Sequence, residues 1–331
     1  MKYQKLGNKL NVSKIGIGCM GMSFAYGEYP EAESIKTLHH AIELGVNFFD
    51  TAECYGPYRN EILLGKAFKH KRDKVIIATK FGFAIDPSTE KVIGFNSKPE
   101  HVKAVAEASL KRLGVEVIDL FYQHRVDPEV PIEETVGAMA QLVKEGKVRA
   151  LGLSEAEPDE IKRAHATHPI TALQSEYSLW TRSVEHEILP LCKELGIGFV
   201  PYSPLGRGFF TGKFTREMIS KNDFRSVLPR FSEDNFDSNQ KLLKNLNEIA
   251  KEKQCTMAQL VLAWLMHQDE NIFPIVGVRR MQHLEENLNS LNVKLDENDQ
   301  KRISEALPLD QVKGDRYSGG PKAKQAIVTS N

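Results

Sequence analysis

A regular alternation of short apolar runs with longer amphipathic segments constrains the fold of this chain more than any other feature. Nearly continuous apolar runs are typical of parallel strands that are buried on both faces. The alternation begins near residue 14 and continues to about residue 291. The strands that it predicts are 14–18, 46–49, 75–79, 117–123, 148–153, 171–174, 197–202 and 272–276.

Amphipathic segments separate these strands, and several of them end at a glycine that suits a helix C-cap. The expected helices are 32–44, 60–70, 98–113, 132–144, 158–165, 184–195, 240–252, 257–267, 281–291 and a closing helix at 296–306. Eight strand–helix units predict an α/β fold that closes as a single (β/α)8 TIM barrel. An open doubly wound sheet is the main competing fold, but it usually divides into two domains and the sequence shows no linker.

Several segments lie outside this alternation. Residues 1–17 alternate loosely around a turn at Gly7 and predict an N-terminal β-hairpin. Four long connections are expected at 20–30, 81–97, 204–237 and the C-terminal segment. The first three follow strand ends and therefore fall on the face where barrel enzymes build active sites. We expect one domain over residues 1–331, with 313–331 as a flexible tail or part of the substrate loop.

The amino-acid composition limits the kinds of partner that this chain is expected to bind. Lys+Arg and Asp+Glu each number 44, so net charge offers no argument for nucleic acid or an anionic membrane as a partner. The four cysteines include no close pair, which excludes a C-x-x-C motif and fits a reducing compartment. No stretch approaches 18 apolar residues, and the first residues have no apolar signal core. We therefore expect a cytoplasmic protein that binds neither nucleic acid nor membranes.

Four titratable residues lie at the ends of consecutive predicted strands. Asp50 and Tyr55 follow the second strand, Lys80 follows the third and His124 follows the fourth. Because these strand ends share one face of a barrel, the four side chains could converge on one site. Each residue alone also has an ordinary explanation, as a cap, a turn residue or a solvated charge. Together and in this order, they are better explained as a functional set.

This set of residues suits a reaction in which hydride attacks a carbonyl carbon and the carbonyl oxygen is protonated. An ammonium group near Tyr55 would lower its pKa from the free value of about 10, which gives Lys80 a role. Asp50 would supply the counter-charge for Lys80, and His124 could orient the carbonyl oxygen by a hydrogen bond. General-acid catalysis of this kind contributes roughly 10²–10⁴-fold in rate.

The series of motifs resembles the aldo-keto reductase family over residues 6 to about 317. It is most similar to the branch of plant perakine reductase-like and auxin-induced-protein-like reductases. The motifs are FDTA at 49–52 with YG at 55–56, QHRVD at 123–127, GKVRALGLSE at 146–155, QSEYS at 174–178, PYSPLGRG at 201–208, and GVRR at 277–280 with LEEN at 284–287. The resemblance implies the Asp50, Tyr55, Lys80 and His124 tetrad and reduction of an aldehyde or ketone, reversible as alcohol oxidation.

The resemblance also implies NADP(H) as cofactor. Ser154 and Gln174 would hold the carboxamide, Tyr202 would stack on the nicotinamide, and Arg279 would bind the 2′-phosphate. The loop from Ser203 to Lys213 would fold over the pyrophosphate. The other positions implied to contact the cofactor are Gly21, Met22, Pro204, Leu205, Gly206, Arg207, Gly208, Gly212, Gly277, His283, Glu286 and Asn287.

The expected partner is a small-molecule carbonyl compound that contacts Tyr55 and His124. Trp180 could line its pocket or pack a loop, and Cys54 could sit at the pocket rim. Glu155 departs from the family pattern, because many relatives have Asn after this serine. The sequence carries no indication of oligomeric state.

Two segments resemble nucleotide-binding motifs but lack features that those motifs require. Residues 16–21 match G-x-G-x-x-G, but the segment that follows contains Gly27 and Pro30 and does not open a helix. Residues 206–213 resemble a P-loop, but Phe214 stands where Ser or Thr is required.

Two further functions remain open. Potassium-channel β subunits share this fold, so the chain could be a cofactor-loaded regulatory subunit. A metal-dependent isomerase or lyase would need ligands clustered at strand ends. Only Asp50 and His124 are available, so we expect no metal.

Overall fold

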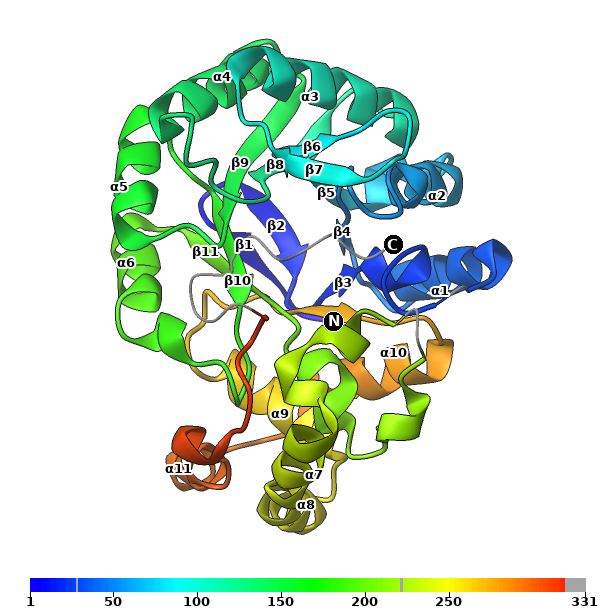
Figure 1. Cartoon of the computed structure of the whole chain (residues 1–331), viewed down its shortest axis with the longest axis vertical. Coiled ribbons are helices and arrows are strands. Elements are labelled where there is room, and N and C mark those ends of the chain that lie inside the picture. The colour runs from blue at the N-terminus through cyan, green and yellow to red at the C-terminus, as the bar shows by residue number, and fades with distance from the viewer. Residues whose placement is uncertain (28, 221–222, 319–331) are drawn as a thin grey trace.

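The computed structural model describes residues 1–27, 29–220 and 223–318. Eight parallel strands form one sheet in the order β11-β10-β9-β8-β5-β4-β3-β12, surrounded by helices (Figure 1). The strands are β3 Gly16–Gly18, β4 Phe48–Asp50, β5 Ile76–Phe81, β8 Ile118–Gln123, β9 Val148–Ser154, β10 Ala172–Glu176, β11 Gly198–Tyr202 and β12 Ile275–Gly277. This arrangement confirms the predicted (β/α)8 barrel.

The barrel closes through the segment just before β12. Phe199 and Ile272 form an isolated parallel bridge between the two edges of the sheet. The Phe199 amide donates to the Asn271 carbonyl at 2.9 Å, and the Phe273 amide donates to the Phe199 carbonyl at 2.8 Å. Regular pairing with β3 then starts at Ile275, later than expected, because Pro274 has no amide hydrogen to donate.

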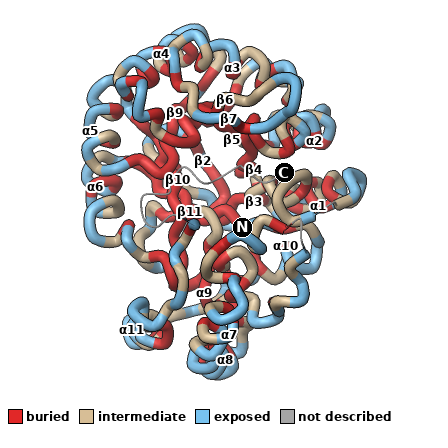
Figure 2. Tube along the Cα trace, viewed as in Figure 1, coloured by how far each residue is buried: buried red, intermediate tan, exposed pale blue. Residues whose placement is uncertain are grey.

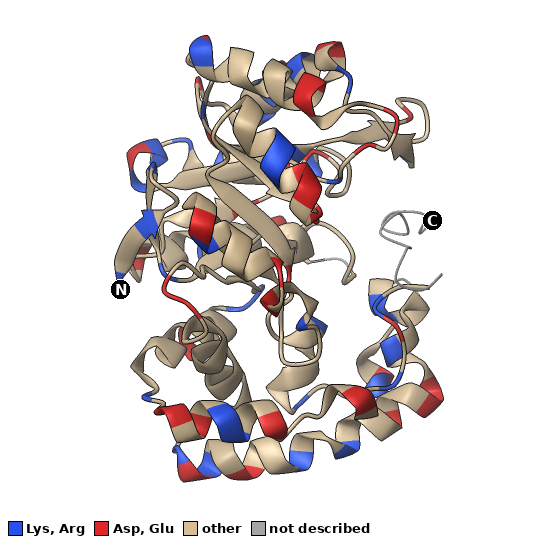
Figure 3. Cartoon of the chain, turned by 90° about the vertical axis from the view of Figure 1, so that its left-hand side faces the viewer, with Lys and Arg blue, Asp and Glu red and all other residues tan. Residues whose placement is uncertain are grey.

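Helices cover the outside of the barrel, with their buried residues turned toward the strands (Figure 2). They are α1 Glu31–Glu43, α2 Arg59–Phe68, α3 Pro99–Leu113, α4 Ile132–Lys144, α5 Pro158–Thr167, α6 Ile188–Leu195, α9 Met257–Met266, α10 Met281–Leu288 and α11 Glu297–Glu305. The helix predicted over 184–195 is shorter, since Ser183–Glu185 forms a separate 3-10 turn. Lys, Arg, Asp and Glu are interspersed over the outer helices (Figure 3).

A β-hairpin closes the amino-terminal end of the barrel, as predicted. It consists of β1 Tyr3–Leu6 and β2 Leu10–Ser13. Leu6, Leu10 and Val12 are buried in one cluster with the inward side chains of the strands. The inward residues of this cluster are Phe48, Ala78, Leu120, Tyr122, Ala150, Ala172, Val200, Phe273 and Ile275. The barrel interior is therefore a packed core rather than a channel.

Two of the long connections contain structure that the sequence pattern does not reveal. The connection over 81–97 holds an antiparallel hairpin of β6 Phe83–Ile85 and β7 Val92–Phe95. The connection over 204–237 holds several 3-10 turns and the start of α7 Glu233–Lys241, which precedes α8 Leu243–Glu252. The single helix predicted over 240–252 is thus wrong at its start. In α7 the only buried residues are Phe236 and Asn239, so it has little apolar periodicity.

Candidate active site

The four residues of the predicted tetrad meet at the carboxyl ends of β4, β5 and β8. Lys80 Nζ donates hydrogen bonds to the Asp50 carboxylate, to the Thr51 carbonyl at 2.7 Å and to Tyr55 Oη at 3.3 Å. The ring of Tyr55 meets the ring of His124 edge-on, with centroids 5.8 Å apart. Asp50, Lys80 and His124 are buried, and Tyr55 is partly exposed. The ammonium therefore lies between a carboxylate and a phenol.

Burial dominates the proton affinities of this set. The sequence predicts a lowered pKa for Tyr55, whereas burial, followed by the Asp50 carboxylate, raises it well above its ordinary value. Burial, then the charges of Lys80 and Arg125, lowers the pKa of His124 well below its ordinary value. At neutral pH the site therefore presents a protonated phenol and a neutral imidazole.

Cys54 contacts His124 at the ring nitrogen Nδ1. Its Sγ lies 3.5 Å from His124 Nδ1. Burial raises the pKa of the Cys54 thiol, so the sulfur keeps its hydrogen and can donate it to Nδ1. An accepting Nδ1 leaves Nε2 as the N–H donor of the neutral ring. The sequence indicated only that this thiol could lie near the pocket, because its contact is with a residue 70 positions away.

The residues predicted to hold the nicotinamide lie on neighbouring strand ends. Gln174 is paired in register with Ser154, and Tyr202 pairs with Glu176 two positions farther along. Gln174 Nε2 donates to Asp50 Oδ2 at 2.8 Å, which links this group to the tetrad. Arg125 Nη1, which the sequence analysis did not single out, donates to Ser154 Oγ at 3.2 Å. Gly21 and Met22 lie in the 3-10 turn Met20–Met22 after β3.

The loop predicted to cover the pyrophosphate is held in an irregular conformation. Ser203, Gly206, Arg207, Gly208 and Gly212 all have positive φ, and residues 206–211 form a distorted 3-10 turn. Arg207 points inward, where its Nη2 lies 3.3 Å from Glu176 Oε2. The exposed Lys213 lies 3.9 Å from the Glu286 carboxylate on α10 and so spans the gap to that helix. Pro204 and Leu205 complete the loop between β11 and the turn.

The residues predicted to hold the adenosine lie on or next to α10. Arg279 donates from Nη1 to the Tyr26 carbonyl at 2.9 Å, with its guanidinium 5.4 Å from the Tyr29 ring centroid. Asn287 is buried, while Gly277 and His283 are exposed. These residues form a group separate from the tetrad, on the side of the barrel where β3 meets β12.

Trp180 is buried beneath the loop over 204–237. Its ring stacks on Phe209 with centroids 4.5 Å apart, and the Arg230 guanidinium lies 4.8 Å above it. A Cβ on Gly206, which has φ +56°, would come within 2.9 Å of the Trp180 ring. The contacts of Trp180 are thus with the loop, and its predicted contact with substrate stays a prediction.

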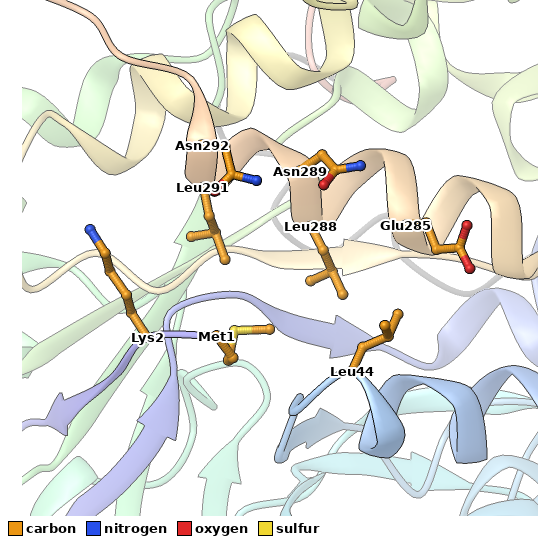
Figure 4. A pocket seen from close by; sticks show the side chains of 8 residues that line it. All are labelled: Met1, Lys2, Leu44, Glu285, Leu288, Asn289, Leu291 and Asn292. Carbon is orange, nitrogen blue, oxygen red and sulfur yellow. The ribbon is translucent and has the colours of Figure 1, made fainter.

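A cavity of about 500 Å³ lies away from this site, at the opposite end of the barrel. Figure 4 shows the side chains that line it. The cavity is lined by the residue after α1, by the end of α10 with the 3-10 turn Asn289–Asn292 that follows it, and by the first two residues of the chain. The lining residues are Met1, Lys2, Leu44, Glu285, Leu288, Asn289, Leu291 and Asn292. It brings together no set of side chains comparable to the tetrad.

The described part of the chain contains neither a candidate metal centre nor a candidate membrane span. Among these residues no group of three or more His, Cys, Asp or Glu side chains could hold a metal ion. The same residues form no helix that is long and apolar enough to cross a membrane.

Comparisons with known proteins agree with this geometry. The model of the Aldo/keto reductase family matches residues 14–308. A Glycine max protein named Probable aldo-keto reductase 1 is 51% identical over 319 residues, which cover 96% of this chain and 92% of that protein. The structure of glycerol dehydrogenase AKR11B4 from Gluconobacter oxydans superposes with a TM-score of 0.83 at 27% identity, covering 92% of this chain and 94% of that one. The thermostable aldo-keto reductase Tm1743 superposes with a TM-score of 0.74 at 30% identity, covering 92% of this chain and 100% of that one.

The closed barrel and the Asp, Tyr, Lys and His side chains at its carboxyl end define an oxidoreductase of the (β/α)8 class. The chain belongs to the aldo/keto reductase family, because the family model spans most of its length and a member covers nearly all of it at 51% identity. This family generally uses nicotinamide cofactors.

Proposed function

We propose that this protein reduces an aldehyde or ketone to an alcohol with NADPH, in a reversible reaction. The observation that carries this proposal is the position of Lys80 Nζ, hydrogen-bonded to the Asp50 carboxylate and 3.3 Å from Tyr55 Oη. A buried ammonium in this place would stabilise the negative charge that develops on the phenol as it gives up its proton.

Each side chain of the tetrad has a separate role in this reduction. A bound nicotinamide would supply hydride to the carbonyl carbon. Tyr55 Oη donates its proton to the carbonyl oxygen, and Lys80 stabilises the phenolate that forms. His124 Nε2–H donates a hydrogen bond to the same oxygen, in the tautomer that the Cys54 thiol favours. Asp50 balances the charge of Lys80 and, through Gln174, ties the proton donor to the nicotinamide side of the site.

The residues present fit a phosphorylated dinucleotide. The Glu155 and Glu176 carboxylates are buried among four guanidinium groups, from Arg125, Arg207, Arg230 and Arg316. This cluster therefore holds more positive than negative charge, next to the loop with positive φ values. A pyrophosphate would compensate that excess. Arg279, at the other end of the site, is the residue we assign to the 2′-phosphate.

We also propose a place in the branch of plant perakine reductase-like and auxin-induced-protein-like reductases, which rests on the sequence motifs. We also keep three predictions that rest on the sequence: one domain over residues 1–331, a cytoplasmic location and a carbonyl compound as the substrate. For the predicted tail at 313–331, the residues from 319 onward lie outside the described part of the chain.

The decisive experiment follows NADPH absorbance with 4-nitrobenzaldehyde as substrate. Tyr55→Phe removes the proton donor and should reduce kcat by about 10²-fold or more. Tyr58→Phe is the matched control, because Tyr58 contacts Arg112 rather than the tetrad, and it should keep wild-type activity. Equal activity of Tyr55→Phe and wild type would refute the assigned role.

The same assay discriminates the regulatory-subunit alternative. A wild-type protein that binds NADPH tightly but turns over none of a panel of aldehydes, quinones, ketosteroids and pyridoxal would favour a subunit resembling the potassium-channel β subunits.

A further inference from the structure

The last described residues of the chain lie across the candidate cofactor site. We name residues 312–318 the C-terminal strap. From α11 it runs to the ends of β10 and β11, where it is drawn in red (Figure 1). Asn239 fastens it by two hydrogen bonds to the Lys313 backbone, at 2.8 and 2.9 Å, and Ser318 Oγ donates to the Val227 carbonyl at 2.9 Å. The strap is therefore packed against the loop over 204–237.

Arg316 joins the ends of three adjacent strands. Its Nη2 donates to Glu155 Oε1 and to Tyr202 Oη, each at 2.6 Å. Its Nε lies 2.9 Å from Glu176 Oε2. Glu155 follows β9, Glu176 ends β10 and Tyr202 ends β11. One guanidinium thus fixes the spacing of the three strand ends that carry or flank the predicted nicotinamide ligands.

The contact with Tyr202 is made at its hydroxyl end. The guanidinium carbon lies 5.8 Å from the ring centroid, although Nη2 is only 2.6 Å from Oη. These two distances place the guanidinium beyond the hydroxyl and not on a face of the ring. Tyr317 Oη also lies 3.1 Å from Tyr202 Oη. The strap therefore contacts Tyr202 at its hydroxyl group, and these contacts do not cover a face of the ring.

Glu155 is placed to receive Arg316. It has φ +56°, a left-handed conformation that a residue other than glycine rarely adopts. In this conformation its Oε1 accepts the Glu176 amide at 2.9 Å as well as Arg316. Burial opposes ionisation, but the charges of Arg316 and Arg125 hold the pKa of Glu155 at about 2. A neutral Asn at this position could not balance the charge of the guanidinium.

We propose that the strap is part of the cofactor site and that Arg316 is a positioning residue for NADPH. Arg316 orients Tyr202 for stacking and, through Glu155, the preceding Ser154 for the carboxamide. Tight cofactor binding therefore requires the closed strap. This inference rests on the proposed function, because it assigns these residues a role toward the same cofactor.

The test separates positioning from simple structural support. Arg316→Gln leaves two buried carboxylates short of a partner, so it should lower the unfolding temperature as well as weaken binding. The double variant Arg316→Gln with Glu155→Gln removes the positive charge and one of its carboxylate partners together. It should regain most of the stability that Arg316→Gln loses. The Kd of NADPH, measured by fluorescence titration, should remain raised by about tenfold or more in both variants. The control is Arg302→Gln, which removes an exposed ion pair between Arg302 on α11 and Glu252 on α8. This variant should bind NADPH as wild type does.

A double variant that is stable and binds NADPH with wild-type affinity would overturn the proposal. A double variant that binds NADPH more tightly than wild type would also overturn it, because the strap would then obstruct the site. The proposed function is judged separately, by whether the wild-type protein binds NADPH and reduces carbonyl compounds.

Discussion

Tyr55 keeps its proton because burial, followed by the Asp50 carboxylate, disfavours the phenolate and raises its pKa. Lys80 lies 3.3 Å from its hydroxyl, yet the ammonium is also hydrogen-bonded to Asp50 and to the Thr51 carbonyl. We expect the influence of Lys80 to appear mainly as charge moves onto the phenolate, which is the moment when a fixed ammonium accelerates a reaction. A neutral His124, held by Cys54, avoids a second positive charge beside Lys80.

Glu53, next to Cys54, provides a prediction about pH and stability. Burial, followed by the Glu61 carboxylate, raises the pKa of Glu53 to about 8. Its Oε1 has no hydrogen-bond partner among the described residues. A carboxyl group with a raised pKa contributes stability that is complete below its unfolded pKa and is lost as pH rises through the folded pKa. Wild-type stability should therefore fall between about pH 5 and pH 9 by an amount on the order of a few kcal/mol.

Glu53→Gln cannot ionise and should remove this part of the pH dependence. The free energy of unfolding by urea, measured at pH 5, 7 and 9, should diverge from wild type as pH rises, in favour of the variant. Glu116→Gln, at an exposed position, should follow the wild-type curve. Parallel curves for Glu53→Gln and wild type would contradict the raised pKa.

At the scale of the strand, a period of two residues places the whole site. Phe48, Ala78, Ala172 and Val200 point into the barrel core. Side chains two positions farther along a strand point to the same side. Asp50, Lys80, Gln174 and Tyr202 are those residues. The site is therefore the next layer of the barrel interior, where polar side chains replace apolar ones.

The N-terminal hairpin supports this arrangement from the other end. Leu6 is fully buried, and a Cβ on Gly198 would lie 2.3 Å from Leu6 Cδ1, so the two fit closely. The surrounding strands cannot collapse into the space that Leu6→Ala would leave. We expect this change to lower the free energy of unfolding by about 2–5 kcal/mol.

Urea denaturation would measure that loss, with Lys5→Ala on the exposed face of the same strand as the control. The Kd of NADPH should be unchanged in folded Leu6→Ala, because Leu6 lies at the opposite end of the barrel from the tetrad. A weakened NADPH affinity would show that the hairpin shapes the site as well as stabilising the barrel.

At the scale of the whole molecule, barrel closure brings the segments after the first and the last barrel strand together at one site. Arg279 follows β12, the last strand, and its hydrogen bond to the Tyr26 carbonyl connects it to the loop after β3, the first strand. Arg279→Ala should weaken NADPH binding by about 10–100-fold, because it removes a charge-assisted hydrogen bond to the 2′-phosphate. NADH lacks this phosphate, so its binding should stay nearly unchanged.

Fluorescence titration with both cofactors measures the difference. Arg280→Ala, at the adjacent exposed position, is the matched control and should change neither affinity. Equal losses for NADPH and NADH in Arg279→Ala would remove the reason for assigning the 2′-phosphate to this residue.

The sequence by itself determined the barrel and the placement of Asp50, Tyr55, Lys80 and His124 at its strand ends. Strand and helix periodicity is a local property, and the order of parallel strands then places all of their carboxyl ends on one face. The same reasoning missed α7, which is almost entirely polar, and the hairpin of β6 and β7, whose strands are only three and four residues long.

Only the tertiary structure decided how the site is completed. Gln174 meets Asp50 across 124 residues, and Arg316 meets Glu155 across 161. No local pattern marks such partners, because each is selected by the space that the closed barrel leaves. The same holds for the pKa values of Tyr55 and His124, whose direction is set by burial and not by the residue types alone.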